Sequence, residues 1–500
     1  MTAVRWAWRT WAVVAAACVA GGGCGGGIAW PDGPVSSEGA ADGTTTKAFA
    51  VGGSSRPNYY QRLVKGRVRE LSFDDDADGV VDERVELAPN GPDAAHCVII
   101  LDGVPFDLVR AMCDEGHFQL FGPPVRVVSV FPAMTDMALS RIVRSERCVA
   151  AESLYFDRDR NALSNGNQVY MSGQNAPWRS RVQYAAPQRV AINTYLFPAS
   201  VWATELRGMH ALFDRTKTGM AIGYSVGTAG LGTRGGEEAI RRYLIDVEKL
   251  CERITYDRRG RVRFTILADH GHSLQRCERV SFRKALTDAG FRMTQTLQAP
   301  NDVVTINYGL VTCALFHTNR AAEVAATLVK HPAVDLVTYA DDDDVVVRNA
   351  DGQAAIRQRP GGFAYDASRG DPLALAPVLA QLRATGHVDD DGTIEDRPLF
   401  DATVTHRYPD PLHRLWDCFH ALVDKPADVI VSLRPEACHG SRFFHFFVAP
   451  VASTHGGLDY SSSVTFLLTN AARKPLPPAI RVDDVYDLLR VEPPADNPAN

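Results

Sequence analysis

The stretch 97–103 constrains the fold of this chain more than any other. It reads Cys-Val-Ile-Ile-Leu-Asp-Gly, a continuous apolar run that stops on Asp102 and a glycine. Such runs are typical of parallel strands buried on both faces, and open α/β sheets bind ligands at the carboxyl ends of such strands. The sequence therefore predicts a buried strand that delivers Asp102 to a binding crevice.

Beyond Asp102, apolar strands alternate with helical stretches, which predicts an α/β fold with a mostly parallel sheet sandwiched by helices. The predicted strands are 97–101, 125–130, 220–226, 262–268 and 428–433. A helix is predicted over 237–254, because four apolar side chains there recur at helical spacing: Ile240, Leu244, Val247 and Cys251.

Residues 300–391 differ from this pattern, with short strand-like runs, one helix and acidic turns. They are interpreted as an inserted α+β cap over the active edge of the sheet, or as a plain elaboration of the fold. The phosphatase-like domain then comprises 91–299 and 392–492, and 493–500 is expected to form a disordered tail.

Residues 1–24 are typical of a signal or lipoprotein leader, with basic residues, a short apolar core and small residues. Cys24 follows three glycines, which loosely resembles a bacterial lipoprotein cleavage site. We therefore expect export to the periplasm or the cell surface, with or without a lipid anchor to a membrane. Residues 25–58, rich in Gly, Ser and Thr, are expected to form a flexible tether.

An acidic β-hairpin is predicted over 59–90, because apolar and polar residues alternate on both sides of an acidic run. The run matches the first part of a calcium loop, since oxygens at alternate positions and a glycine can wrap a hard cation. Its candidate calcium ligands are Asp74, Asp76, Asp78 and Asp82. The acid that ends such a loop falls on Val85, so a solvated acidic turn is the alternative.

Charge and cysteine content exclude other classes of protein. The chain has 53 basic and 59 acidic residues and a net charge of -6, which argues against a nucleic-acid-binding surface. Its 10 cysteines include no C-x-x-C pair, which argues against a zinc-thiolate site. An even number beyond the leader permits disulfides in an exported protein.

Three further stretches carry metal-ligand or nucleophile chemistry. Asp269 and His270 follow the strand 262–268 directly, and a carboxylate beside an imidazole suits a divalent ion. Thr135 follows a proline-containing turn and starts a helix, where backbone amides stabilise phosphate, unless it is only the helix N-cap. His455 precedes two glycines and is either a ligand or a structural histidine.

In this order, these stretches resemble the type I phosphodiesterase/nucleotide pyrophosphatase family of the alkaline phosphatase superfamily. The resemblance covers roughly 97–468, and its most specific parts are Leu-Asp-Gly at 101–103, Asp-His-Gly at 269–271 and Thr-His-Gly-Gly at 454–457. It implies a phosphorylated small-molecule substrate and one or two zinc-like divalent ions beside a threonine nucleophile, here Thr135. One ion would be held by Asp102, Thr135, Asp269 and His270, and His455 would belong to the other.

The sequence departs from the family at the second ion. The expected aspartate and histidine fall on Ala229 and Thr233, and neither is a useful ligand for such an ion. Some members carry their nucleophile at a position that is Val130 here, which has no hydroxyl. The second ion is either held by nearby groups or lost, and three candidates for rebuilding its site are His210, Asp214 and His272.

Two functions follow from these residues. The first is an exported, metal-dependent phosphodiesterase or phosphatase, a phosphoric ester hydrolase that forms a phospho-threonine intermediate at Thr135. The alternative is a catalytically impaired member that binds a phosphorylated ligand, because Ala229 and Thr233 replace two metal ligands. A sulfatase is disfavoured, since nothing resembles the cysteine-centred motif of those enzymes.

Overall fold

The computed structural model describes residues 28–87, 94–165, 176–187, 190, 193–472 and 475–489. The predicted leader at 1–24, including Cys24, and the predicted tail at 493–500 lie outside these residues. Within the described ranges, no helix has the length and apolar character needed to cross a membrane. The eight cysteines in those ranges are free thiols, and all but Cys113 are buried.

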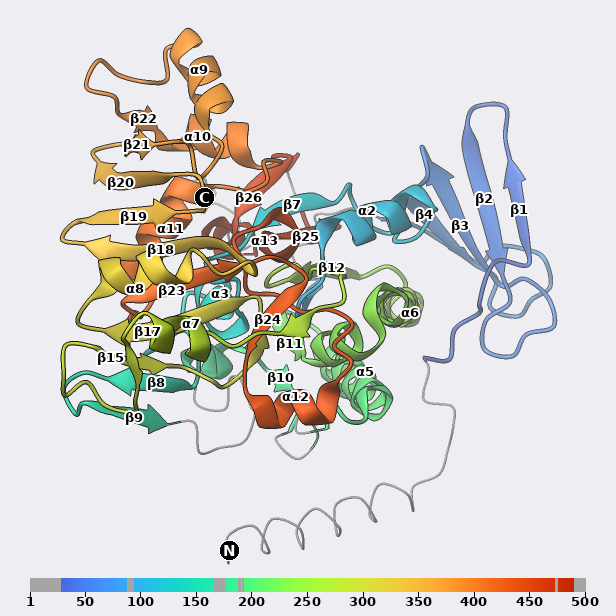
Figure 1. Ribbon diagram of the computed structural model, residues 1–500. Helices are drawn as coiled ribbons and strands as arrows, with labels where there is room; N and C mark the ends of the chain where they lie inside the picture. Colours follow the sequence, from blue (N-terminus) through green and yellow to red (C-terminus); the bar gives the residue numbers. More distant parts are fainter. Residues whose placement is uncertain are drawn as a thin grey trace, which may run out of the picture.

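A seven-stranded, largely parallel sheet lies at the centre of the molecule (Figure 1), which confirms the predicted α/β class. Its order is β10-β11-β6-β12-β25-β7-β26, and of these strands β25 alone runs antiparallel to its neighbours. The strands are β6 (Ala95–Leu101), β7 (Val125–Val128), β10 (Tyr184–Ala185), β11 (Met220–Ser225), β12 (Val262–Ala268), β25 (Val464–Thr469) and β26 (Ala479–Arg481).

The predicted strand at 97–101 is the middle of β6, and every residue of β6 is buried. Its side chains alternate between two cores, as a strand's geometry requires. Val98 and Ile100 join the core that contains α3 (Thr135–Ile142), whereas Cys97 and Ile99 face the opposite one. That second core contains α2 (Phe106–Asp114), α5 (Pro198–Arg215) and α6 (Gly227–Asp257).

Helix α6 contains the predicted helix at 237–254 but starts ten residues earlier. The four predicted stripe residues are fully buried: Ile240, Leu244, Val247 and Cys251. Gly236 breaks the helix with a φ of 63°, a conformation that suits a residue without Cβ. The glycine-rich part before Gly236 lacks apolar periodicity, which explains why the sequence did not predict it as helix.

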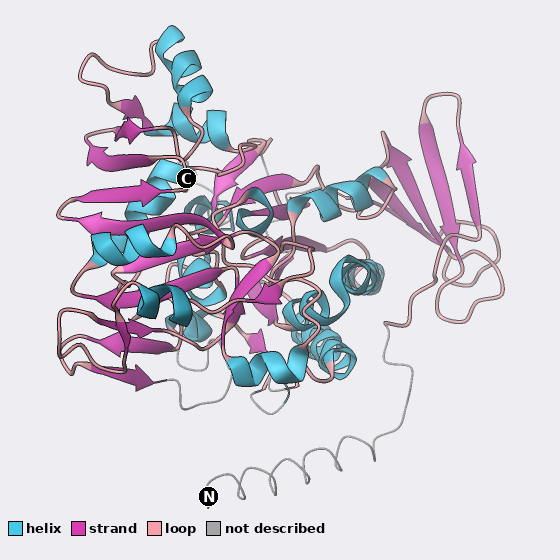
Figure 2. Ribbon diagram, viewed as in Figure 1, coloured by secondary structure: helices cyan, strands magenta, loops and turns pink. Residues whose placement is uncertain are grey.

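A second, nine-stranded sheet stands beside the central one (Figure 2), and it contains the predicted insertion 300–391. Its order is β14-β15-β17-β23-β18-β19-β20-β21-β22. The strands are β14 (Arg292–Met293), β15 (Asp302–Thr305), β17 (Cys313–Thr318), β18 (Val334–Asp341), β19 (Asp344–Arg348), β20 (Gln353–Arg359), β21 (Gly362–Arg369), β22 (Ile394–Glu395) and β23 (Val429–Leu433).

One strand assignment is wrong. The run 428–433 was predicted to belong to the parallel sheet, but β23 lies between β17 and β18 and runs antiparallel to both. All five residues of β23 are buried. A short buried apolar strand looks the same in a parallel or an antiparallel setting, so the pattern does not identify its sheet.

The remaining elements connect or cover these sheets. They are β8 (Leu154–Asp157), β9 (Ala162–Asn165), β13 (Glu278–Arg279), β16 (Leu310–Val311), β24 (Ala437–Gly440), α7 (Arg283–Asp288), α8 (Ala321–Leu328), α9 (Ala376–Ala384), α10 (Asp396–Thr403), α11 (Pro411–His420), α12 (Arg442–Val448), α13 (Tyr460–Ser463), α14 (Val485–Leu489), η1 (Pro177–Arg181) and η2 (Val482–Asp484).

A five-stranded antiparallel sheet precedes the central domain and projects from it on the right of Figure 1. It contains β1 (Ser36–Gly39), β2 (Thr44–Phe49), β3 (Tyr59–Val64), β4 (Arg67–Phe73) and β5 (Glu83–Glu86). The tether predicted over 25–58 therefore differs from the structure, since β1 and β2 lie within it. Polar composition hid a pairing strand whose Phe49 contacts Trp30 and Tyr59.

Candidate functional site

Two neighbouring parallel strands carry the acidic residues of the site. Leu101 of β6 pairs with Ala268 of β12, so the residues that follow them lie side by side at one edge of the sheet. Asp102 and Asp269 are both buried there. Asp269 Oδ1 accepts hydrogen bonds of 2.9 Å from the amides of Gly103 and His270, which fixes its carboxylate.

Thr135 is the first residue of α3, and its hydroxyl reaches the strand ends. Its Oγ1 lies 3.2 Å from His270 Nε2 and 3.5 Å from Asp102 Oδ2. The N-cap position belongs to Met134, which makes no side-chain cap hydrogen bond, so the alternative that Thr135 is only an N-cap is wrong. The amides of the first turn therefore have no side-chain acceptor at the N-cap and suit an anion beside the hydroxyl.

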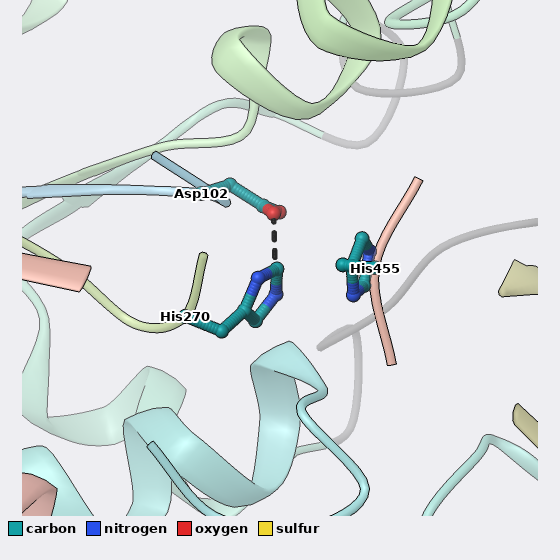
Figure 3. A group of neighbouring side chains, drawn as sticks. All are labelled: Asp102, His270 and His455. Carbon is teal, nitrogen blue, oxygen red and sulfur yellow. Dashed lines mark ion pairs between the residues drawn. The ribbon is translucent and has the colours of Figure 1, made fainter. Parts of the chain in front are cut away.

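Hydrogen bonds fix the ring orientation of two histidines. His270 Nδ1 donates to the carbonyl of Gly271 at 2.8 Å, and His455 Nδ1 donates to the carbonyl of Ala133 at 2.8 Å. Each ring therefore keeps the lone pair of Nε2 for a ligand. The two rings stack with their centroids 4.0 Å apart (Figure 3).

The charge state of the site is unfavourable without a cation. Burial and the carboxylate of Asp269 raise the pKa of Asp102 well above its ordinary range, and burial also raises the pKa of Asp269. Burial lowers the pKa of His270 to about 4, so its ring is neutral near pH 7. Two like charges in a dry site cost free energy unless an opposite charge lies between them.

A divalent cation fits these residues. Asp102 Oδ1 and Asp269 Oδ2 are buried and have no hydrogen-bond partner among the described residues, and they lie 3.7 Å and 3.5 Å from His270 Nε2. Two carboxylate oxygens and an imidazole nitrogen form a donor set typical of zinc. Ligand atoms of Asp102, His270 and His455 also lie within 4.8 Å of one another. Figure 3 draws these three side chains.

We call Asp102, Thr135, Asp269 and His270 the Thr135 half of the site, and His455, His272, Ala229 and Thr233 the His455 half. Thr233 lines the same cavity as Thr135 and His455, in agreement with the position that the sequence comparison assigned to it. Ala229 is buried in the first turn of α6, and neither residue brings a carboxylate or an imidazole. The His455 half therefore holds imidazoles but no carboxylate.

His272 occupies space in the His455 half. Within the part of the chain that the structure describes, its buried Nε2 has no hydrogen-bond partner, and a Cβ placed on Gly232 would lie 2.9 Å from it. Its ring lies 5.8 Å from that of His455, and a hydrogen bond joins its Nδ1 to Ser453 Oγ. Among the three groups proposed to rebuild the second site, His272 is near His455, whereas Asp214 is exposed on α5 and does not line the cavity.

Three functional side chains were missed by the sequence predictions. Tyr224 OH donates a 2.6 Å hydrogen bond to Asp102 Oδ2, and its place near the end of β11 was a usable signal. Trp178 Nε1 donates to Asp136 Oδ1 at 2.9 Å, behind Thr135. Arg179 lines the cavity with a buried Nε that has no hydrogen-bond partner in the described ranges, and no sequence pattern marks it.

The acidic turn lies in the N-terminal sheet, apart from the cavity. Asp74 is buried and accepts hydrogen bonds from the amides of Asp78 and Gly79, and Asp82 accepts one from Asp75. Asp74, Asp76 and Asp78 do offer three oxygens close together. Because backbone amides already satisfy the buried carboxylate, the geometry favours the acidic turn, and calcium stays a prediction.

Sequence comparisons do not assign the chain, because no family model and no curated protein match it. Solved structures resemble it at low similarity. Human ectonucleotide pyrophosphatase/phosphodiesterase 5 is 11% identical, with 79% of this chain and 93% of that chain covered and a TM-score of 0.41. Phosphonoacetate hydrolase from Sinorhizobium meliloti 1021 is 11% identical, with 81% and 96% covered and a TM-score of 0.41. Scores this low carry no argument about function.

Proposed function

We propose that this chain is a metal-dependent phosphoric ester hydrolase, either a phosphodiesterase or a phosphatase, with Thr135 as its nucleophile. The observation that carries the proposal is the position of the Thr135 hydroxyl. Thr135 starts a helix whose N-cap makes no side-chain hydrogen bond. Its hydroxyl oxygen lies 3.2 Å from a histidine nitrogen and beside two buried carboxylates, each with an oxygen that has no partner among the described residues.

The chain's own groups support attack on phosphorus. Because His270 Nε2 and Asp102 Oδ2 are acceptors, the Thr135 hydroxyl donates its proton toward them and presents its oxygen lone pairs to the cavity. Amides at the start of α3 and the guanidinium of Arg179 bind phosphoryl oxygens. Trp178 fixes Asp136 behind the nucleophile.

The reaction proceeds in two displacements. In the first, a bond forms between Thr135 Oγ1 and phosphorus while the bond to the leaving oxygen breaks, and the leaving group takes a proton. In the second, a water oxygen bonds to phosphorus and the bond to Thr135 breaks, which frees the hydroxyl and releases the phosphoryl product.

A divalent ion would be held by Asp102, Asp269, His270 and Thr135, with His455 beside them. Once bound, it supplies a Lewis acid that lowers the pKa of an alcohol oxygen and shields phosphoryl charge. The unpartnered oxygens of both carboxylates support this assignment.

The experiment that tests the proposal is hydrolysis of an aryl phosphodiester and an aryl phosphomonoester by wild type and Thr135→Ala. The protein is chelated and then supplied with zinc, manganese or calcium. We expect metal-dependent turnover that Thr135→Ala lowers by at least about 10³-fold. Metal-dependent turnover that Thr135→Ala preserves would refute the nucleophile assignment.

The second candidate function is a catalytically impaired member that binds a phosphorylated ligand. It is favoured by the His455 half, where Ala229 and Thr233 stand at the places of metal ligands and offer none. Binding of phosphate to Thr135→Ala and wild type alike, with no turnover in any metal, would support it.

Export forms part of the proposal on the pattern of residues 1–24, with a lipid anchor at Cys24 as its stronger form. The mass of the mature protein would distinguish cleavage of the leader alone from cleavage with a diacylglyceryl group added at Cys24.

A further inference from the structure

Helix α12 places a cluster of aromatic side chains on the surface. Phe443, Phe446 and Phe447 are 71%, 79% and 46% exposed, and their spacing puts them on one face of the helix. Their rings contact one another, with centroids 4.8 Å apart for Phe443 and Phe447. We call these three residues the α12 patch. Exposed apolar clusters of this kind mark interaction sites.

The opposite face of α12 is apolar as well. Val448 is fully buried, and Phe444 lies against Tyr195 with ring centroids 4.9 Å apart. Both Phe444 and Tyr195 line the cavity that contains Thr135. The inner face thus anchors the helix in the protein, so the outer phenylalanines are not available to the core. A helix that is apolar on both faces and lies on the surface needs a second apolar environment.

The cations around the patch indicate its partner. Arg442 is exposed at the start of α12, Arg279 Nε donates to the carbonyl of Gly440, and Arg234 Nη1 donates to the carbonyl of Val448. Among the described residues, none of these arginines pairs with a carboxylate. Aromatic side chains beside uncompensated arginines are complementary to the interface of a bilayer that contains anionic lipids.

We propose that the α12 patch docks this protein onto the surface of an anionic lipid bilayer. The helix lies at the lower edge of the molecule in Figure 1 and is not recessed between other elements, which suits an extended flat partner. The phenylalanines enter the headgroup region, and the arginines face lipid phosphates.

The test is flotation of the full chain with vesicles of phosphatidylcholine, with or without phosphatidylglycerol. Wild type is compared with Phe443→Ser/Phe446→Ser/Phe447→Ser, which keeps Phe444. Both proteins carry the same N-terminal residues, so a leader or anchor contributes equally. We expect wild type to bind the anionic vesicles, less so at high salt, and the triple variant to bind at least about tenfold less.

A matched control removes three other exposed apolar side chains that lie outside α12: Val35, Val80 and Met220, which are 63%, 65% and 41% exposed. The variant with serine at these positions should bind like wild type. Arg442→Glu should lose much of the preference for phosphatidylglycerol. Melting temperatures close to that of wild type would show that all variants fold.

Two results would overturn the proposal. One is equal binding to anionic vesicles by wild type and the triple variant, or none by either. The other is a wild-type dimer that the triple variant converts to a monomer in light scattering, without vesicle binding, which would assign the patch to a second copy of the chain. Neither result depends on hydrolysis, so the docking proposal and the proposed function fail separately.

Discussion

The Thr135 half and the His455 half share one cavity and one edge of the central sheet, yet they differ in the metal-ligand groups that their side chains offer. In the Thr135 half, buried carboxylate oxygens lack partners and lie close to a histidine nitrogen. In the His455 half, small residues stand on α6 and the space beside them holds His272. Among the described residues, the unpartnered carboxylate oxygens of the first half suit a cation, whereas Ala229 and Thr233 bring no carboxylate or imidazole to the second.

The two halves therefore differ in the number of ligand groups that they offer to a metal ion. A ligand atom of His455 lies within 4.8 Å of the ligand atoms of Asp102 and His270, so His455 is close enough to serve the same ion. We therefore expect one tightly held ion per chain rather than two.

The largest expected effect comes from Asp269→Ala. Losing a buried ligand oxygen should abolish tight metal binding and lower turnover of an aryl phosphodiester by about 10³-fold or more. His455→Ala should lower the same turnover only about tenfold, because its half of the site contributes one ligand. Metal analysis and steady-state kinetics on both variants check this, and equal losses would break the comparison.

A second prediction concerns stability without metal. The pKa of Asp269 in the folded state is raised from its ordinary 3.8 to about 7. Between these two pH values the folded state therefore holds more protons than the unfolded state. The free energy of unfolding of the chelated protein should therefore fall as pH rises toward 8. Asp269→Asn, whose amide oxygen still accepts from Gly103 and His270, should be more stable than wild type at pH 8 by about 2 kcal/mol.

In the His455 half, the free energy of unfolding changes with pH in the opposite direction. Burial lowers the pKa of His272 and His455 below the ordinary 6.5, so their contribution to stability is lost as pH falls below that value. Because the titration of Asp269 between 3.8 and about 7 opposes this acid limb, Asp269→Asn should steepen the fall in the free energy of unfolding below pH 6.5, measured in urea with chelator present. An Asp269→Asn variant whose acid limb is as shallow as that of wild type would contradict this assignment of the two limbs.

The smallest expected effect is a gain. Ala229→Asp/Thr233→His restores the ligand types that the resemblance predicts, four residues apart on α6, and should raise the metal content from about one ion to two. If His272 fills the space, the second ion should appear only when His272→Ala is added. No second ion in either variant would show that the half was lost for reasons beyond these side chains.

The sequence predicted those features that depend on one element at a time. The strands that end in Asp102 and Asp269 and the helical stripe on α6 were found because burial leaves a local pattern. Which sheet β23 joins was not predictable, because a five-residue apolar run carries no information about its neighbours.

The site was predicted only in part for the same reason. Asp102, Thr135, Asp269, His270 and His455 meet as expected from motifs, but the hydrogen bond from Tyr224 and the approach of Arg179 arise from tertiary packing. The N-terminal strands β1 and β2 were also missed, since their polar residues form a strand only beside the edge that β3 provides.

The strand order also determines the point in synthesis at which the two sheets can be completed. β23 fills the place between β17 and β18, and β25 fills the place between β12 and β7. A growing chain therefore holds two sheets with a missing central strand until residues 429–433 and 464–469 leave the ribosome. Unpaired edges of this length invite pairing with other chains, so ribosome stalling before these strands emerge should produce aggregates, whereas release of the full chain should not.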